Sequence, residues 1–136
     1  MRRYSHLGEH GMLWFALGGA GALLDAGRRR HWIRSTAVVG GSYVISTSIK
    51  LAIGRKRPLV EDLPHLMATP TGLSFPSSHS SSSFAAARAY GTLLPAPPLY
   101  LAASAMAFSR LYLGVHYPSD IAAGIALGSV LGTLGR

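Results

Sequence analysis

Residues 121–135 read IAAGIALGSVLGTLG and contain no charged side chain. Three further windows lack Asp, Glu, Lys and Arg as well, namely residues 12–24, 35–49 and 89–109. A soluble domain usually carries about 25% charged residues, whereas this chain of 136 residues carries 13% and is 49% hydrophobic. Because so few charges cannot cover a soluble surface, the pattern predicts a membrane protein.

The remaining composition excludes several classes of protein. The chain has no cysteine, which excludes disulfides, thiolate catalysis and cysteine-based zinc sites. Its high hydrophobicity excludes intrinsic disorder. The formal net charge of +8 favours a partner that carries phosphate groups. No cleavable signal peptide is evident, and we expect residues 1–136 to form a single membrane-embedded domain.

The predicted fold class is all-α, a polytopic membrane bundle of about five transmembrane helices. Glycine and proline separate the apolar segments. The expected helices cover roughly residues 7–26, 33–53, 77–94, 98–113 and 118–135. Because successive membrane helices alternate in direction, the ends of the second and fourth helices should lie on the same side as the starts of the third and fifth.

Small residues recur at every fourth position of the last predicted helix, at Gly124, Gly128 and Gly132. This spacing leaves bare backbone along one helix face, as in small-xxx-small packing. Two interpretations stay open. The face packs inside the bundle, or it is the seam of a homo-oligomer.

The side on which those four helix ends meet collects most of the reactive polar residues. They are Lys50, Arg57, His79, Arg110, His116 and Asp120. Three cations at one place repel one another unless an anion lies between them, and a phosphate group fits a guanidinium fork and an ammonium charge. Ser77 and Ser78 follow Pro76 at a predicted helix start, where backbone amides favour an anion. Capping of that helix is the alternative role of the pair.

His116 and Asp120 are four residues apart, which places them on one face of a helix. A carboxylate that binds one imidazole nitrogen leaves the other free as a nucleophile. His79 can then protonate the leaving alkoxide. Metal binding by the two histidines and the carboxylate is a rival interpretation, but the neighbouring cations oppose a divalent ion. We therefore expect no metal and no cofactor.

The spacings form three ordered motifs. They read K-x6-R-P over residues 50–58, P-S-S-H over residues 76–79 and S-R-x5-H-x3-D over residues 109–120. This set resembles the type 2 phosphatidic acid phosphatase family, the lipid phosphate phosphatases. Vanadium haloperoxidases and bacterial class A acid phosphatases share the same site. The second motif usually reads P-S-G-H in that family, so Ser78 is a departure from the pattern.

The resemblance implies a role for each matching residue. Phosphate binding would fall to Lys50, Arg57, Ser77, Ser78 and Arg110. His79 would be the acid, His116 the nucleophile and Asp120 its orienting partner. The resemblance also implies an integral membrane phosphatase that acts on a lipid phosphate through a phosphohistidine intermediate.

The substrate is less well defined by the sequence. Residues 5–10, the short length and the composition resemble small actinobacterial members of the family, which favours a polyprenyl-linked sugar phosphate in cell-wall precursor synthesis. Glu9 and His10 are candidates for contact with the substrate head group, with capping of the first helix as the alternative. Phosphatidic acid, phosphatidylglycerol phosphate and polyprenyl diphosphate are the other substrates considered.

Two other functions are weighed against the phosphatase. A non-catalytic protein that binds anionic lipid would need the cations but not the two histidines and Asp120. A vanadate-dependent oxidase is disfavoured by the hydropathy, because those enzymes are soluble and longer. We expect a multi-pass protein of the bacterial plasma membrane that binds membrane lipids and no nucleic acid.

Overall fold

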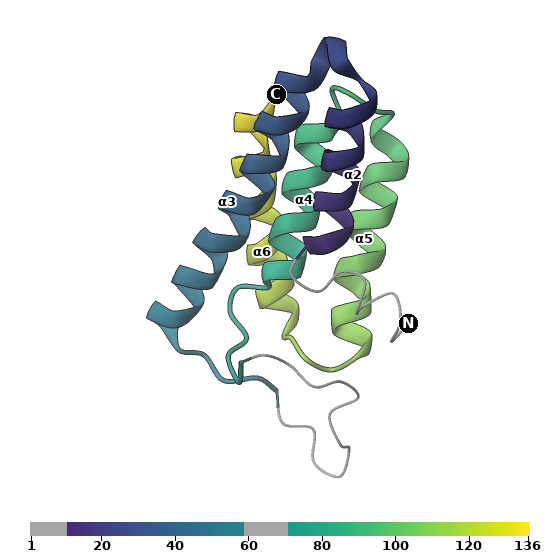
Figure 1. Cartoon of the computed structure of the whole chain (residues 1–136). Coiled ribbons are helices and arrows are strands. Elements are labelled where there is room, and N and C mark those ends of the chain that lie inside the picture. Colours follow the sequence, from purple (N-terminus) through teal and green to yellow (C-terminus); the bar gives the residue numbers. More distant parts are fainter. Residues whose placement is uncertain (1–10, 59–70) are drawn as a thin grey trace.

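The computed structural model describes residues 11–58 and 71–136. Within these ranges the chain forms α-helices joined by short turns and loops (Figure 1). The helices are α2 (Met12–Leu24), α3 (Arg29–Ile53), α4 (Ser78–Tyr90), α5 (Ala96–Tyr112) and α6 (Pro118–Gly132). Two short 3-10 turns, η2 (Ala26–Arg28) and η3 (Thr133–Gly135), complete the described structure. The predicted all-α class and the helix order are confirmed.

The helices lie side by side, and their first and last residues gather at the two ends of the bundle (Figure 1). The last residues of α3 and α5 lie at the same end as the first residues of α4 and α6. The turn from α2 to α3 and the C-terminus lie at the opposite end. The expectation that the reactive residues share one end of the bundle is therefore correct.

Helix α4 is the centre of the bundle and packs against α3, α5 and α6. Its sequence, SHSSSSFAAARAY, consists mainly of serine and alanine, and almost every residue in it is buried. Small side chains let the neighbouring backbones approach closely. Two hydrogen bonds tie α2 to this centre: Trp14 Nε1 donates to Ser83 Oγ at 2.9 Å, and the Tyr90 hydroxyl donates to the Trp14 carbonyl at 3.0 Å.

The glycine face of α6 packs against α4. A Cβ atom at Gly124 would lie 2.6 Å from the Ser77 carbonyl oxygen, and one at Gly128 would overlap the Ser81 carbonyl oxygen. A Cβ atom at Gly132 would lie 2.6 Å from that of Arg88. Helix α4 therefore covers this face, so the interpretation of packing within the bundle is correct. The oligomeric state of the protein stays a prediction.

One helix of the described residues is long and apolar enough to cross a membrane by length and composition, within the segment Ala26–Ile53. The other helices have 13 to 17 residues, against about 20 for a full span. The number of spans stays a prediction.

Candidate active site

Lys50 lies in the last turn of α3, where the partial negative charge of the helix end favours a cation. Gly54 ends the helix in the left-handed conformation, with φ of 67°, and its amide donates to the Lys50 carbonyl at 3.0 Å. A residue with a Cβ atom is strained in this conformation. The glycine thus turns the chain directly after Lys50, which is itself only 7% exposed.

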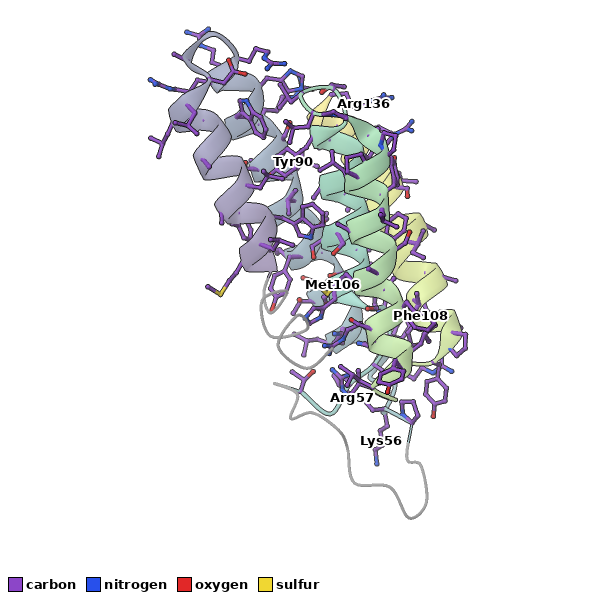
Figure 2. The ribbon with its side chains drawn as sticks, turned by 90° about the vertical axis from the view of Figure 1, so that its right-hand side faces the viewer. Lys56, Arg57, Tyr90, Met106, Phe108 and Arg136 are labelled. Atoms are coloured by element: carbon purple, nitrogen blue, oxygen red, sulfur yellow. The ribbon has the colours of Figure 1, made fainter. Side chains whose placement is uncertain are left out.

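The segment that follows carries Arg57 and is held by backbone pairing. The Arg57 amide donates to the Gly72 carbonyl at 3.1 Å, and the Ser74 amide donates to the Arg55 carbonyl at 2.7 Å. The Arg57 guanidinium donates through Nη1 to the Val115 carbonyl at 2.7 Å. Figure 2 shows Arg57 at the end of the bundle away from Arg136. The first motif is thereby fixed against the turn between α5 and α6.

The second motif begins α4. Ser77 is the N-cap residue, and its Oγ accepts hydrogen bonds from the Ser80 amide at 3.4 Å and the Ser80 hydroxyl at 3.1 Å. The capping role considered for this pair is therefore present at Ser77. Its own hydroxyl proton is not used in either bond, so capping and donation to a phosphate are compatible.

Ser78 and His79 are the first two residues of α4. The Ser78 hydroxyl is buried and has no hydrogen-bond partner within residues 11–58 and 71–136. His79 is half-buried. The first amides of a helix have no acceptor within it, which makes this end of α4 suitable for an anion.

The third motif starts on α5 and ends on α6. Arg110 lies in the last turn of α5 and is 1% exposed. Its carbonyl accepts a hydrogen bond from the Val115 amide at 3.3 Å. The turn then places His116, 4% exposed, just ahead of α6. The Ser77 amide donates to the Asp120 carbonyl at 3.0 Å, which joins the second motif to the third.

His116 lies between a cation and a carboxylate. Its Nε2 is 3.4 Å from Arg57 Nη1, and its Nδ1 is 3.6 Å from Asp120 Oδ2. Because a guanidinium can only donate, Nε2 has to be the unprotonated nitrogen, which assigns the proton to Nδ1 on the Asp120 side. In this tautomer Nε2 carries the lone pair that a nucleophile needs.

The electrostatics also favour a neutral imidazole. Burial is the main cause that lowers the pKa of His116 to about 2. The further causes are the charges of Arg57, Arg110, Lys50 and His79, in that order. Burial lowers the pKa of Arg57 too, while the Asp120 carboxylate opposes that change. These four groups thus act on His116, and the structure brings the residues of the three motifs together.

Asp120 has a partner that sequence reasoning missed. Its Oδ1 pairs with Arg55 Nη1 at 3.0 Å, and its Oδ2 accepts from the Tyr117 amide at 2.8 Å. No role was predicted for Arg55, which occupies an undefined position of the K-x6-R-P motif. A signal was nevertheless present, because a buried carboxylate needs a compensating charge and the chain has few acidic residues for its many cations.

Two predicted head-group contacts, Glu9 and His10, lie outside the described residues. In residues 11–58 and 71–136, no group of three or more His, Cys, Asp or Glu side chains is placed to hold a metal ion.

Comparisons with known proteins identify the family of the chain. A family model described as the PAP2 superfamily matches residues 31–135. A decaprenylphosphoryl-5-phosphoribose phosphatase of Mycobacterium tuberculosis is 40% identical over 98% of this chain and 75% of its own length. One of the same name from Mycolicibacterium smegmatis is 43% identical over 90% of this chain and 68% of its own.

A solved structure is similar as well. The transmembrane PAP2-type phosphatidylglycerolphosphate phosphatase of Bacillus subtilis superposes with a TM-score of 0.79 at 25% identity. The match covers 99% of this chain and 72% of that one. The helical bundle, the three motifs at one end of it and these relatives lead to one conclusion. The chain belongs to the PAP2 superfamily and is an integral membrane phosphatase that acts on a lipid-linked phosphate.

Proposed function

We propose that this phosphatase removes the terminal phosphate of a polyprenyl-phosphate-linked sugar phosphate, with decaprenylphosphoryl-5-phosphoribose as its leading substrate. The two mycobacterial relatives carry the name of that activity. The observation that carries the chemistry is the position of His116, with Nε2 facing Arg57 and Nδ1 facing Asp120. The proposed location is the bacterial plasma membrane, where such a lipid resides.

In the first step, the lone pair on His116 Nε2 attacks the phosphorus atom. The bond between phosphorus and the sugar oxygen breaks, and the leaving alkoxide takes a proton from His79. The products are a phosphohistidine and the free sugar hydroxyl. As Nε2 bonds to phosphorus, positive charge develops on the imidazole ring. The Nδ1–H group is then attracted more strongly to the Asp120 carboxylate. We expect the 3.6 Å separation of these two groups to shorten in this state.

In the second step, water attacks the same phosphorus from the side that the alcohol has left. His79, now neutral, takes the proton of the water. The bond between Nε2 and phosphorus breaks, inorganic phosphate leaves, and both histidines return to their starting state.

The phosphate oxygens are held by charge and by hydrogen-bond donors. Lys50 and Arg110, both buried, and Arg57, which is half-buried, supply three positive charges, and such interactions are strong away from water. Ser77 and Ser78 add hydroxyl groups and the amides at the start of α4. These groups bind an anion whose charge grows on the equatorial oxygens during transfer.

A panel of lipid phosphates offered to the purified protein in detergent tests the proposal, with released phosphate as the measurement. The panel contains decaprenylphosphoryl-5-phosphoribose, phosphatidylglycerol phosphate, phosphatidic acid and a polyprenyl diphosphate. We expect the highest kcat/KM for the first and no release by His116→Ala. The variant Lys56→Gln removes an exposed cation near the site and serves as the control.

Each contrary result has a clear meaning. A preference for phosphatidylglycerol phosphate would replace the proposed substrate with that of the Bacillus subtilis relative. Phosphate release that persists in His116→Ala would overturn the phosphohistidine mechanism. Binding of anionic lipid vesicles without any turnover would favour the non-catalytic alternative.

A further inference from the structure

Arg55 lies inside the first motif at a position that the motif leaves undefined, and its contacts are to the third motif. Its Nη1 pairs with Asp120 Oδ1 at 3.0 Å and donates to the Ser119 hydroxyl at 2.9 Å. The guanidinium carbon lies 4.2 Å from the centre of the Tyr117 ring. Three contacts along the start of α6 thus come from one side chain, over a sequence separation of about 65 residues.

The two ends of the ion pair differ sharply in exposure. The side chain of Asp120 is fully buried, whereas that of Arg55 is 39% exposed. A buried carboxylate without a charged partner is strongly unfavourable. In the part of the chain that the structure describes, Arg55 is the one permanently charged side chain in an ion pair with Asp120. It therefore supplies the directly paired charge for Asp120 from the solvent side, in addition to the charge of Arg57 nearby.

The backbone of Arg55 is fixed as well. Its carbonyl accepts from the Ser74 amide at 2.7 Å and from the Ser74 hydroxyl at 3.3 Å. Arg55 thereby connects the segment that carries Arg57 to the carboxylate beside His116. Arg55 Nη1 holds Oδ1 and leaves Oδ2 on the side of the imidazole, 3.6 Å from Nδ1.

We propose that Arg55 is a positioning residue, which acts on the nucleophile His116 through Asp120 and does not bind the substrate phosphate. The inference rests on the proposed roles of His116 and Asp120. It predicts that loss of Arg55 impairs the chemical steps, in which Asp120 has to face a ring that becomes positive. It predicts little change in the binding of substrate, because the phosphate-binding cations are other residues.

Kinetics with an aryl phosphate test this, because turnover of that substrate does not depend on which lipid the enzyme prefers. We expect Arg55→Gln to lower kcat by on the order of 100-fold, as for a small misplacement of a reacting group, with KM nearly unchanged. Arg55→Lys should recover part of the loss, since it restores the charge but not the planar guanidinium beside the Tyr117 ring. The matched control is Lys56→Gln, the exposed neighbour, for which we expect a change within about twofold.

The decisive measurement is a double-mutant cycle with Asp120→Asn. If Arg55 acts through Asp120, then Arg55→Gln should lower kcat no further in the Asp120→Asn background. If Arg55 instead binds the phosphate, the same substitution would raise KM by a similar factor in both backgrounds, and the inference would be overturned. An equal loss of kcat in both backgrounds would overturn it too.

The outcome is separable from that of the proposed function. A lipid panel with the wrong preference, together with a non-additive cycle on the aryl phosphate, would reject the substrate and keep Arg55 as a positioning residue. If Arg55→Gln fails to fold, the double-mutant cycle is measured with Arg55→Lys instead, because lysine keeps the charge that compensates Asp120.

Discussion

Arg57 Nη1 lies 3.4 Å from His116 Nε2, the nitrogen to which the mechanism assigns the attack on phosphorus. The same Nη1 donates to the Val115 carbonyl at 2.7 Å, which keeps the guanidinium in place without an anion. A transferring phosphoryl group bonded to Nε2 would therefore form next to a positive charge that is already oriented. This preorganisation is the main way in which proteins stabilise the charge of such a transition state.

The buried, neutral His116 makes stability depend on pH. Its pKa is about 2 in the folded protein and about 6.5 in an unfolded chain. Below pH 6.5 the unfolded state therefore binds a proton that the folded state does not, so stability falls as the pH falls towards 2. At pH 5 we expect this effect to cost about 2 kcal/mol.

Thermal unfolding in detergent at pH 7 and pH 5 measures this effect. The loss of Tm on acidification should be smaller in His116→Gln than in the unsubstituted protein, because the variant lacks the titrating group. Parallel curves for the two proteins would show that His116 is not a buried neutral group.

Activity should not require a divalent metal. Three side-chain cations surround His116 and perform the charge stabilisation that Mg²⁺ supplies in other phosphoryl-transfer enzymes. We expect excess EDTA to leave the rate of phosphate release nearly intact. Vanadate should inhibit, since a trigonal-bipyramidal vanadate on His116 resembles the transferring group. A complete loss of activity that Mg²⁺ or Zn²⁺ restores would refute the metal-free mechanism.

The main features of the fold were predictable because they depend on local signals. Charge-free windows and the prolines and glycines between them indicated the helices and their order. The predicted positions of the helix ends were less accurate. Helix α3 begins at Arg29 and not near residue 33, and the arginines there bind distant backbone. Arg29 Nε donates to the Ala22 carbonyl and Arg34 Nε to the Leu134 carbonyl, each at 2.9 Å.

The site was predictable to the extent that motif spacing defines it. Lys50, Arg57, Arg110 and His116 were found because their spacings are specific and because alternation of helices brings them to one end. Arg55 was not found because its role depends on a partner about 65 residues away in the sequence. Only the pairing of residues 55–57 with residues 72–74 places it beside Asp120.

The close contact of α6 with α4 should not tolerate a larger residue. A Cβ atom at Gly128 would overlap the Ser81 carbonyl oxygen, and overpacking of this kind costs about 1–3 kcal/mol. We expect Gly128→Ala to lower the Tm in detergent. The matched control is Gly41→Ala in α3, where nothing lies within 4 Å of the added carbon and alanine is the better helix former by up to about 1 kcal/mol. Equal effects of the two substitutions would contradict the packing.

Arg88 should be structural, although an ionisable residue inside a membrane helix is a functional candidate by default. It lies ten residues after Ser78 on α4, about 15 Å further along the axis at 1.5 Å per residue. Its neighbour is Gly132, at the far end of α6. We expect Arg88→Gln to keep its turnover within about twofold. A folded variant without turnover would show that Arg88 takes part in the chemistry.

His79 and His116 should fail differently when each is replaced by alanine. The nucleophile is required for every substrate, because without it no covalent intermediate forms. The acid is required in proportion to how poor the leaving group is. A sugar or lipid alkoxide needs a proton, whereas a nitrophenolate is stable as an anion. His79→Ala should therefore lose about 10²–10⁴ in rate on a lipid phosphate but still form the phosphohistidine from an aryl phosphate, which gives a burst of nitrophenolate.

His116→Ala should be inactive on both substrates, and Asp120→Asn should fall between the two histidine variants, because it keeps the imidazole but favours the wrong tautomer. Rapid quench of His79→Ala in alkaline denaturant, after brief exposure to an aryl phosphate, tests the roles directly, because phosphohistidine survives in base and is lost on later acidification. Phosphate should be found on His116, whose Nε2 faces the site beside Arg57. A label on His79 would reverse the assignment of nucleophile and acid, and an equal loss of the nitrophenolate burst in both histidine variants would reject it.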